Sequence, residues 1–169
     1  MLPNKETYRD FVLGLVLQMR PHHILEIGLG SCHTTAAELL HYAEEDFEKL
    51  FVIEKDPNPV ALEEISSAMD DGRCELRKGD SRDPAMYEGL SDGQNTCDLV
   101  LVDGLHTAQG VYSDIQMIVN HNILTPDGVI VFHDGGASNV RLGINQAAKD
   151  FGLQVLHLPA LNLSIGKYA

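Results

Sequence analysis

Short apolar segments alternate with helix-like segments along most of the chain, and this alternation limits the fold more than any other feature. Each of five apolar runs has the length of a buried β-strand, and each precedes a stretch suited to a helix. The runs lie at residues 23–27, 50–53, 74–77, 98–102 and 129–132. Strands that alternate with helices form parallel sheets covered by helices on both faces. The pattern predicts a doubly wound α/β fold.

The helix-like segments carry apolar residues at three- and four-residue spacing, and some have clear start signals. Asn4 can cap the first helix, and Asn58 followed by Pro59 is a typical helix start. The expected helices cover residues 5–20, 34–48, 59–69, 84–90, 111–119 and 140–151. We expect the first of them to be a packing helix on one face of the sheet, with no catalytic share.

The end of the chain follows a different pattern. Residues 153–158 and 161–166 are two strand-like runs joined by only a few residues around Pro159. Such a short link permits only an antiparallel pair, because a parallel crossover needs a dozen residues or more. Upstream, residues 125–128 read as a turn that leads into the fifth strand. The complete prediction is a mostly parallel, seven-stranded sheet with a C-terminal antiparallel hairpin.

Length and composition place the chain among ordinary globular proteins. Its 169 residues suit one domain over residues 1–169, and 44% apolar with 22% charged residues argues against disorder. The formal net charge of −13 disfavours nucleic acid and anionic membrane surfaces as partners. The three cysteines are odd in number and lack metal-type spacing, which favours a reducing cytoplasm. We expect no signal segment and no membrane span.

In open parallel sheets, ligands bind beyond the carboxyl ends of the strands. All five expected parallel strands end in acidic residues, glycine or histidine. These strand ends are Glu26 to Gly30, Glu54, Asp80 with Ser81, Asp103 to His106, and His133 with Asp134. We therefore expect one site along this rim of the sheet.

The turn after the first strand favours a cationic ligand over a dinucleotide. Gly28 and Gly30 allow the backbone to approach a ligand closely, although a simple turn would also use them. The dinucleotide fingerprint G-x-G-x-x-G requires a third glycine, and this chain has His33 there. A pyrophosphate would also gain little from Glu26, which lies just before the turn.

Two further strand ends suit an adenosine. Glu54 can accept both hydrogen bonds of a ribose diol, and Asp80 with Ser81 can meet the amino edge of an adenine ring. Simpler roles remain open, because Glu54 can be a surface acid opposite Lys55 and Asp80 can cap a helix.

The combined pattern resembles the class I S-adenosylmethionine-dependent methyltransferases, and within them the group related to metal-assisted sugar and antibiotic O-methyltransferases. The resemblance runs from Ile24 to Ile165. Its most telling pieces are residues 24–28, 98–106, Val111 with Asp114 and Ile115, and 128–134. One departure is the stretch Ser31-Cys32-His33, where a glycine is common.

The resemblance implies that Glu26, Gly28 and Gly30 hold the amino-acid part of the cofactor, Glu54 its ribose, and Asp80 with Ser81 its adenine. The full expected set of cofactor-binding residues is Glu26, Gly28, Gly30, Ser31, Glu54, Asp80, Ser81 and Asp103. The expected function is methyl transfer to a small, hydroxyl-bearing acceptor.

Asp103 and Asp134 should end neighbouring strands about 4.8 Å apart, so both carboxylates can reach one Mg²⁺. The resemblance implies that such an ion holds the acceptor's oxygens. His133 is a less secure ligand, because consecutive strand residues face opposite ways unless the strand has already turned. His106 is the candidate base, assisted by Asp103. Without a metal, the acids can cap helices or bind cofactor, and His106 can fix its loop.

Two other functions remain open from the sequence alone. The chain leaves few residues for a lid over the acceptor, so it can be a binding module without catalysis. An NAD-dependent oxidoreductase is less favoured, because His33 replaces the last glycine of the dinucleotide fingerprint. If the chain is an enzyme, either its acceptor is small or a second subunit closes the site.

Overall fold

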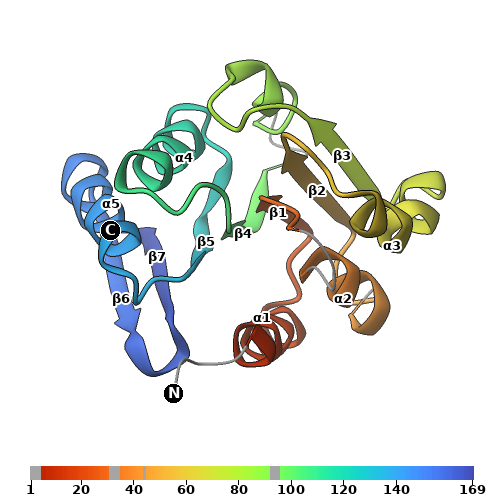
Figure 1. Cartoon of the computed structure of the whole chain (residues 1–169), viewed down its shortest axis with the longest axis horizontal. Coiled ribbons are helices and arrows are strands. Elements are labelled where there is room, and N and C mark those ends of the chain that lie inside the picture. Colours follow the sequence, from red (N-terminus) through yellow and green to blue (C-terminus); the bar gives the residue numbers. More distant parts are fainter. Residues whose placement is uncertain (1–4, 31–34, 44, 92–95) are drawn as a thin grey trace.

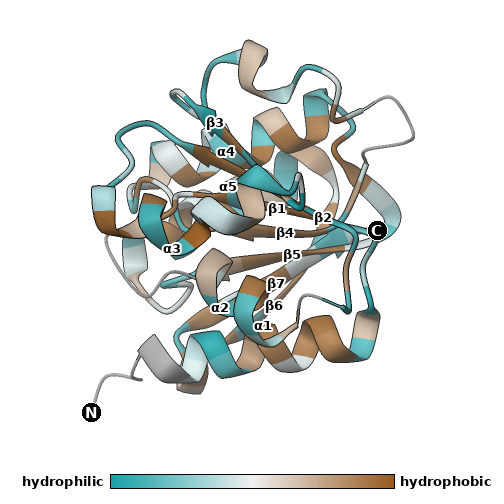
Figure 2. Ribbon diagram, turned by 90° about the vertical axis from the view of Figure 1, so that its right-hand side faces the viewer, coloured by the Kyte–Doolittle hydropathy of each residue, from teal (hydrophilic) through white to brown (hydrophobic). Residues whose placement is uncertain are grey.

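A computed structural model of the chain describes residues 5–30, 35–43, 45–91 and 96–169. Its centre is a seven-stranded sheet with the order β3-β2-β1-β4-β5-β7-β6 (Figure 2). The strands are β1 His23–Ile27, β2 Lys49–Glu54, β3 Cys74–Lys78, β4 Cys97–Val102, β5 Leu124–His133, β6 Leu153–Leu158 and β7 Leu163–Tyr168. The first five are parallel, whereas β7 runs antiparallel to both β5 and β6. The predicted sheet and its terminal hairpin are confirmed.

Helices cover both faces of this sheet (Figure 1). The α-helices are α1 Lys5–Met19, α2 Thr35–Tyr42, α3 Pro59–Asp70, α4 Ala108–Asn120 and α5 Ser138–Phe151, with 3₁₀ turns at Pro84–Tyr87 and Pro159–Leu161. α1, α2 and α3 lie on one face, and α4 and α5 lie on the other. No helix among the described residues is long and apolar enough to cross a membrane.

The core consists of two apolar layers, because successive residues of a strand point to opposite faces. In β1, Leu25 and Ile27 pack toward α4 and α5, while Ile24 packs toward α1, α2 and α3. The central strand β4 is buried on both faces from Leu99 to Val102. Each fully buried aliphatic side chain contributes about 1.5–3 kcal/mol. These strands therefore form a firm base for the residues at their ends.

The second helix is shorter than predicted. α2 ends at Tyr42, whereas the sequence predicts a helix to residue 48. The chain leaves the helix because Phe47 is buried against the core and the N–H of Glu48 donates to the carbonyl of His22, 2.8 Å away. Backbone pairing at the start of β2 thus outweighs local helix propensity. By contrast, the predicted start of α3 is confirmed, since Asn58 Oδ1 accepts from the N–H of Val60 at 2.9 Å.

Two other local predictions need correction. The predicted helix at residues 84–90 is only a 3₁₀ turn, Pro84–Tyr87, because the buried side chains of Tyr87 and Leu90 hold the chain close to the core. The predicted turn at residues 125–128 lies inside β5, where the register jumps between the pairs Cys97–Leu124 and Leu99–Val129. The turn residues are an insertion within the strand rather than its boundary.

The strand order places a crevice at the middle of the sheet. β1 has β2 on one side and β4 on the other, so the chain moves outward in opposite directions from β1. In open parallel sheets, the loops diverge at such a point and leave room for a ligand. The carboxyl ends of β1, β2, β3 and β4 all border this crevice.

Candidate functional site

The turn after β1 forms the floor of the crevice. Gly28 has φ +93°, and a Cβ at this position would lie 2.3 Å from the carbonyl oxygen of Asp103. The N–H of Gly28 donates to Ile53, and the N–H of Asp103 donates to Ile27. Only glycine permits this backbone conformation at such close approach. The turn is therefore held between the ends of β2 and β4.

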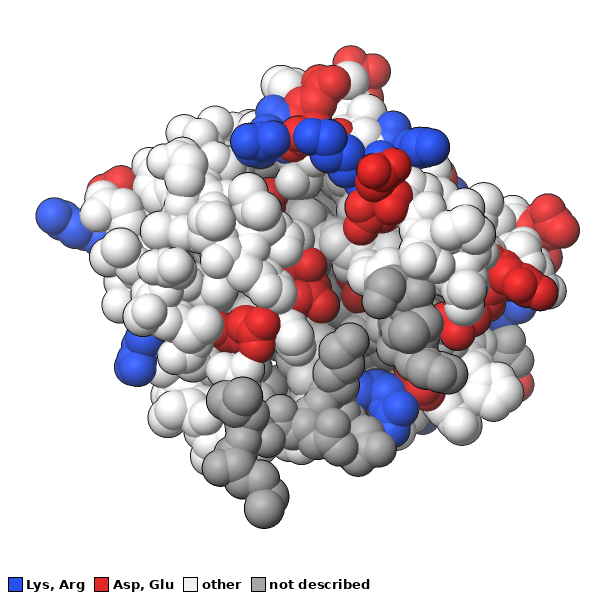
Figure 3. Space-filling view, viewed as in Figure 1, with Lys and Arg blue, Asp and Glu red and all other residues white. Residues whose placement is uncertain are grey.

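A pocket of about 350 Å³ opens above this turn. It collects the ends of four strands and the first turns of α4, and Figure 3 shows acidic side chains in the hollow of this face and basic side chains along its upper rim. Its polar and glycine lining is Gly28, Gly30, Glu54, Lys55, Gly79, Asp80, Ser81, Arg82, Asp103, Gly104, Gly110 and Asp114. Six of the eight residues expected to bind cofactor thus share one pocket. Ser31 lies outside the described residues.

Glu26 is the seventh expected residue, and it is buried directly before the pocket floor. Its side chain is 1% exposed, and no described residue forms a hydrogen bond with its Oε2. Burial, and then the negative charge of Asp103, raise the pKa of Glu26 well above its ordinary value. A buried carboxyl group with an unpartnered oxygen favours a cationic or hydrogen-donating ligand.

Glu54 is fixed by the backbone at the end of β2. Its Oε2 accepts from the N–H of Leu29 at 2.9 Å, and its Oε1 accepts from the N–H of Asp56 at 2.8 Å. A carboxylate has about four acceptor positions, so each oxygen can accept one more hydrogen bond. The side chain is half-buried and lines the pocket, which suits a neighbouring pair of hydroxyl groups.

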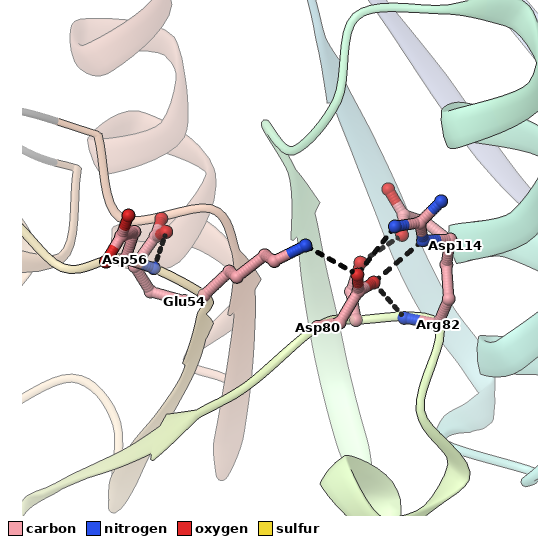
Figure 4. A network of polar contacts seen from close by, with 7 residues as sticks. Glu54, Asp56, Asp80, Arg82 and Asp114 are labelled. Atoms are coloured by element: carbon pink, nitrogen blue, oxygen red, sulfur yellow. Dashed lines mark hydrogen bonds and ion pairs between the residues drawn. The ribbon is translucent and has the colours of Figure 1, made fainter.

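Asp80 has a different environment, which Figure 4 shows from close by. Its Oδ1 accepts from Nε and the backbone N–H of Arg82, and its Oδ2 lies 2.6 Å from Nη2 of Arg82 and 3.1 Å from Nζ of Lys55. These bonds, first of all those from the Arg82 side chain, lower the pKa of Asp80. The two cations that line the pocket are therefore both paired with Asp80.

Asp114 enters the same pocket from α4. It is 2% exposed, and its Oδ1 accepts from the hydroxyl of Ser81 at 2.7 Å. Its Oδ2 has no hydrogen-bond partner among the described residues. Burial raises the pKa of Asp114 to about 6. The sequence does carry a signal for this residue, because a carboxylate there interrupts the apolar stripe of Val111, Ile115 and Ile118.

A second group of polar side chains lies beside the pocket, at the ends of β4 and β5. Asp103 Oδ1 is 2.9 Å from Nε2 of His106 and 2.8 Å from Nδ1 of His133. Nδ1 of His106 is also 3.2 Å from Oδ2 of Asp134. Ligand atoms of Asp103, His106 and His133 all lie within 4.8 Å of one another, which suits one metal ion. We refer to these three residues and Asp134 as the Asp–His cluster.

The backbone turns at the end of β5, which resolves the geometric doubt about His133. Asp134 has φ +52°, and its Oδ2 lies 3.6 Å from Nδ1 of His133. The amide of Asn162, next to β7, donates to Oδ1 of Asp134 and fixes this conformation. Both consecutive side chains therefore face the same cluster. The expected base, His106, lies in this cluster with the three expected metal ligands.

Within the cluster, Asp103 and His106 shift each other's pKa. Burial acts to raise the pKa of Asp103, but hydrogen bonds from His106 and His133 outweigh it and lower that pKa. The bond to Asp103 likewise raises the pKa of His106. Each charge stabilises the other, as expected where imidazolium groups face carboxylates.

Tyr8 of α1 is a site residue that sequence reasoning missed. It is 5% exposed, and its ring packs edge-on against His133 with centroids 4.5 Å apart. Its hydroxyl has no hydrogen-bond partner within residues 5–30, 35–43, 45–91 and 96–169. Burial, followed by the charges of Asp103 and Glu26, raises the pKa of Tyr8. The hydroxyl therefore stays protonated near both carboxylates. In the sequence, Tyr8 belongs to the apolar stripe of α1 and gives no sign of this position.

Comparison with known proteins identifies the class. Residues 25–135, about two thirds of the chain, match the model of a family described as a methyltransferase domain. The chain belongs to this methyltransferase family, which confirms the class that the strand-end residues indicate. No curated protein matches the chain.

Solved structures share the fold at low identity. The methyltransferase PaMTH1 of Podospora anserina, solved with bound SAH, is 18% identical with a TM-score of 0.70, over 96% of this chain and 78% of that one. An O-methyltransferase family protein from Burkholderia thailandensis is 18% identical with a TM-score of 0.64, over 96% and 56%. MycE, from the mycinamycin biosynthetic pathway and solved with Mg and SAH, is 17% identical with a TM-score of 0.59, over 96% and 47%. This chain thus spans about half the length of the last two.

Proposed function

We propose that this protein transfers the methyl group of S-adenosylmethionine to an oxygen of a small, hydroxyl-bearing acceptor, as a single domain over residues 1–169. The observation that carries the proposal is the charge of the pocket. Glu54, Asp103 and Asp114 of the lining have no Lys or Arg ion pair among the described residues, and both cations of the lining are paired with Asp80. Such a pocket favours a sulfonium and an ammonium over a pyrophosphate.

The pocket residues divide along the length of an adenosyl sulfonium. Gly28, Gly30 and the buried Glu26 would hold its amino-acid part, and Glu54 would accept the two ribose hydroxyls. The adenine would lie beyond Glu54, in the part of the pocket lined by Asp80, Ser81 and Asp114. Asp103 lines this pocket and also belongs to the Asp–His cluster. The transferred methyl group would therefore lie near Asp103. S-adenosylmethionine itself supplies the electrophilic methyl group.

The Asp–His cluster would bind the acceptor and remove its proton. Two carboxylates and one imidazole are a donor set that fits a divalent cation, and we propose Mg²⁺ held by Asp103, His133 and Asp134. A bound divalent ion lowers the pKa of a hydroxyl that it contacts. His106 would accept the acceptor's proton, with Asp103 fixing its ring. The structural likeness to MycE, which was solved with Mg, supports this assignment.

The partners follow from the same features. The acceptor would be a small molecule, or a second copy of the chain would close the site over it. A formal charge of −13 argues against nucleic acid and membrane surfaces. Cys74 and Cys97 are buried, and an odd total of three cysteines suits a reducing cytoplasm.

Calorimetric titration with S-adenosylhomocysteine tests the proposed function. We expect saturable binding to the wild-type protein and no comparable binding of NAD⁺. A folded protein that binds neither compound would support a fold without this activity, and preferential binding of NAD⁺ would indicate an oxidoreductase. Methyl transfer is then measured with labelled S-adenosylmethionine and a panel of small hydroxylated acceptors.

Metal removal should suppress turnover if the assignment of the cluster is correct. We expect a chelator to reduce the methyl-transfer rate by at least about 100-fold, because a Lewis acid at the acceptor oxygen contributes several kcal/mol. Addition of Mg²⁺, Mn²⁺ or Zn²⁺ in separate samples then shows which ion restores the rate. An undiminished rate in the chelated protein would refute the metal role and leave the cofactor site unaffected.

Replacing Glu54 by Gln should weaken binding of S-adenosylhomocysteine by about 10- to 100-fold. The carboxylate would accept two hydroxyl hydrogen bonds, and bonds to a charged group contribute about 1.5–3 kcal/mol. Calorimetry measures the affinity, and the exposed neighbour Asp56→Asn is the matched control (Figure 4). Equal losses in both variants would contradict a specific role of Glu54.

Replacing Tyr8 by Phe should separate stability from function. The buried hydroxyl has no partner in the part of the chain that the structure describes, so its removal should leave the melting temperature unchanged or slightly higher. If the hydroxyl contacts cofactor or acceptor, kcat/KM should fall by about 10-fold. Thermal unfolding and steady-state kinetics are measured together, with Tyr42→Phe, which is largely exposed, as the control. An unchanged kcat/KM would restrict Tyr8 to packing.

A further inference from the structure

The two carboxylates at the adenine end of the pocket differ in how many bonds they already make. Asp80 accepts two bonds on each oxygen, from Arg82 and Lys55 (Figure 4). A carboxylate oxygen has about two acceptor positions, so these contacts saturate Asp80. A ligand amino group that bonded to Asp80 would have to displace Arg82 or Lys55. Asp80 is therefore a poor acceptor for a new hydrogen bond.

Asp114, by contrast, can still accept hydrogen bonds. Its Oδ1 is fixed by the Ser81 hydroxyl, whereas Oδ2 is buried without a partner. The residue lines the pocket, and Oδ2 lies 3.1 Å from the position that a Cβ on Gly104, another lining residue, would occupy. Since buried polar atoms are normally hydrogen-bonded, an unpartnered oxygen in a ligand pocket indicates that a ligand donor completes it.

We propose that Asp114, rather than Asp80, accepts the hydrogen bond of the adenine 6-amino group through Oδ2 and thereby selects adenine over 6-oxopurines. This inference rests on the proposed function, since it assigns one end of the same cofactor. Ser81 acts as a positioning residue, because its bond to Oδ1 fixes the plane of the carboxylate. Asp80, together with Arg82 and Lys55, forms the rim of the pocket and makes no hydrogen bond to the adenine.

The chemical basis of the selection is the exchange of a donor for an acceptor. Adenine carries an N–H donor at position 6, whereas hypoxanthine carries a carbonyl oxygen there. A buried carboxylate facing that oxygen leaves both acceptors unpaired, and sites of this type discriminate strongly. Asp114 faces Ser81, Asp80 and Arg82, and its carboxylate is largely charged at pH 8, because burial raises its pKa only to about 6.

The test compares S-adenosylhomocysteine with its deaminated analogue, S-inosylhomocysteine, by calorimetry at pH 8. The wild type should bind the adenine compound about 10- to 100-fold more tightly, as expected for one charge-assisted hydrogen bond. Asp114→Asn can present an amide N–H at the same place, so this variant should lose or reverse that preference. Asp80→Asn tests the rival acceptor in the same pocket and should keep the wild-type ratio of the two affinities, even if both affinities change.

The outcomes separate this inference from the proposed function. A wild type that binds neither compound refutes the proposed function. A wild type that binds S-adenosylhomocysteine, together with an Asp114→Asn variant that keeps the full preference, overturns the role of Asp114 alone. If instead Asp80→Asn loses the preference for S-adenosylhomocysteine, Asp80 is the residue that recognises the adenine. If Asp114→Asn does not fold, Ser81→Ala serves as the second variant, and an undiminished preference in that variant counts against the proposal.

Discussion

Asp103→Asn is expected to reduce the methyl-transfer rate by about 10²- to 10⁴-fold while the fold persists. Asparagine keeps the shape of the side chain but removes the charge that His106 and His133 face at 2.9 and 2.8 Å. The variant loses a charged metal ligand and the group that fixes the proposed base. The backbone bond from the N–H of residue 103 to Ile27 does not depend on the side chain, so strand pairing should remain.

Two measurements distinguish this role from a structural one. Titration with Mn²⁺ alone should show a loss of metal affinity of about 100-fold or more in the Asp103→Asn variant, because one of two carboxylate ligands is removed. S-adenosylhomocysteine should still bind, since most of its contacts lie elsewhere in the pocket. Asp127→Asn, an exposed acid in the insertion of β5, is the control. Unchanged metal binding and turnover in Asp103→Asn would remove Asp103 from the site.

The rim of the sheet could be predicted because topology alone brings strand ends together. Once the alternation of strands and helices predicts a parallel sheet, the residue after each strand must lie at the same edge. Glu54, Asp80 and Asp103 come from strands far apart in the sequence, yet they line one pocket. This argument needs only the position of each residue in its strand, and strand ends are easy to read where acid or glycine follows an apolar run.

Helix residues in the site were harder to predict, because a helix face is defined only relative to the sheet it covers. Tyr8 and Asp114 both lie on buried helix faces, one on each side of the sheet. Their contacts depend on how far each helix is shifted along the sheet, which local spacing does not specify. For Asp114 a polar residue within an apolar stripe was a usable signal, whereas Tyr8 looks like any aromatic residue of a packed helix.

Local errors arose where long-range contacts opposed local preference. The segment after Tyr42 contains good helix formers, but pairing of Glu48 with His22 ends the helix early. Residues 125–128 look like a turn in the sequence, which could not reveal that they lie inside β5, at an irregularity in its pairing with β4. Pairing partners come from distant parts of the chain, so such features follow from the assembled sheet.

Asp114→Asn should also change the pH dependence of stability in the ligand-free protein. Burial raises the pKa of Asp114 from 3.8 to about 6, so the folded state binds this proton more tightly than the unfolded state. Above about pH 6, the charged carboxylate therefore destabilises the folded protein by up to about 3 kcal/mol, at about 1.36 kcal/mol for each pKa unit. As the pH falls from 6 toward 4, the folded protein takes up the proton and most of this cost disappears; the rest is lost below the ordinary pKa of 3.8.

The free energy of unfolding of wild type and variant, measured by urea denaturation from pH 4 to pH 8, isolates this effect. The buried amide of asparagine has a cost of its own, but that cost is nearly independent of pH. The advantage of Asp114→Asn should therefore grow by about 2.4 kcal/mol between pH 4 and pH 8, whatever its sign at pH 4. Other titrating groups, including Asp80 and the Asp–His cluster, are common to both proteins and largely cancel in the difference. A constant difference across this range would mean that the pKa of Asp114 is the same in the folded and the unfolded protein, and the carboxylate would then lack the buried charge with which we propose it recognises adenine.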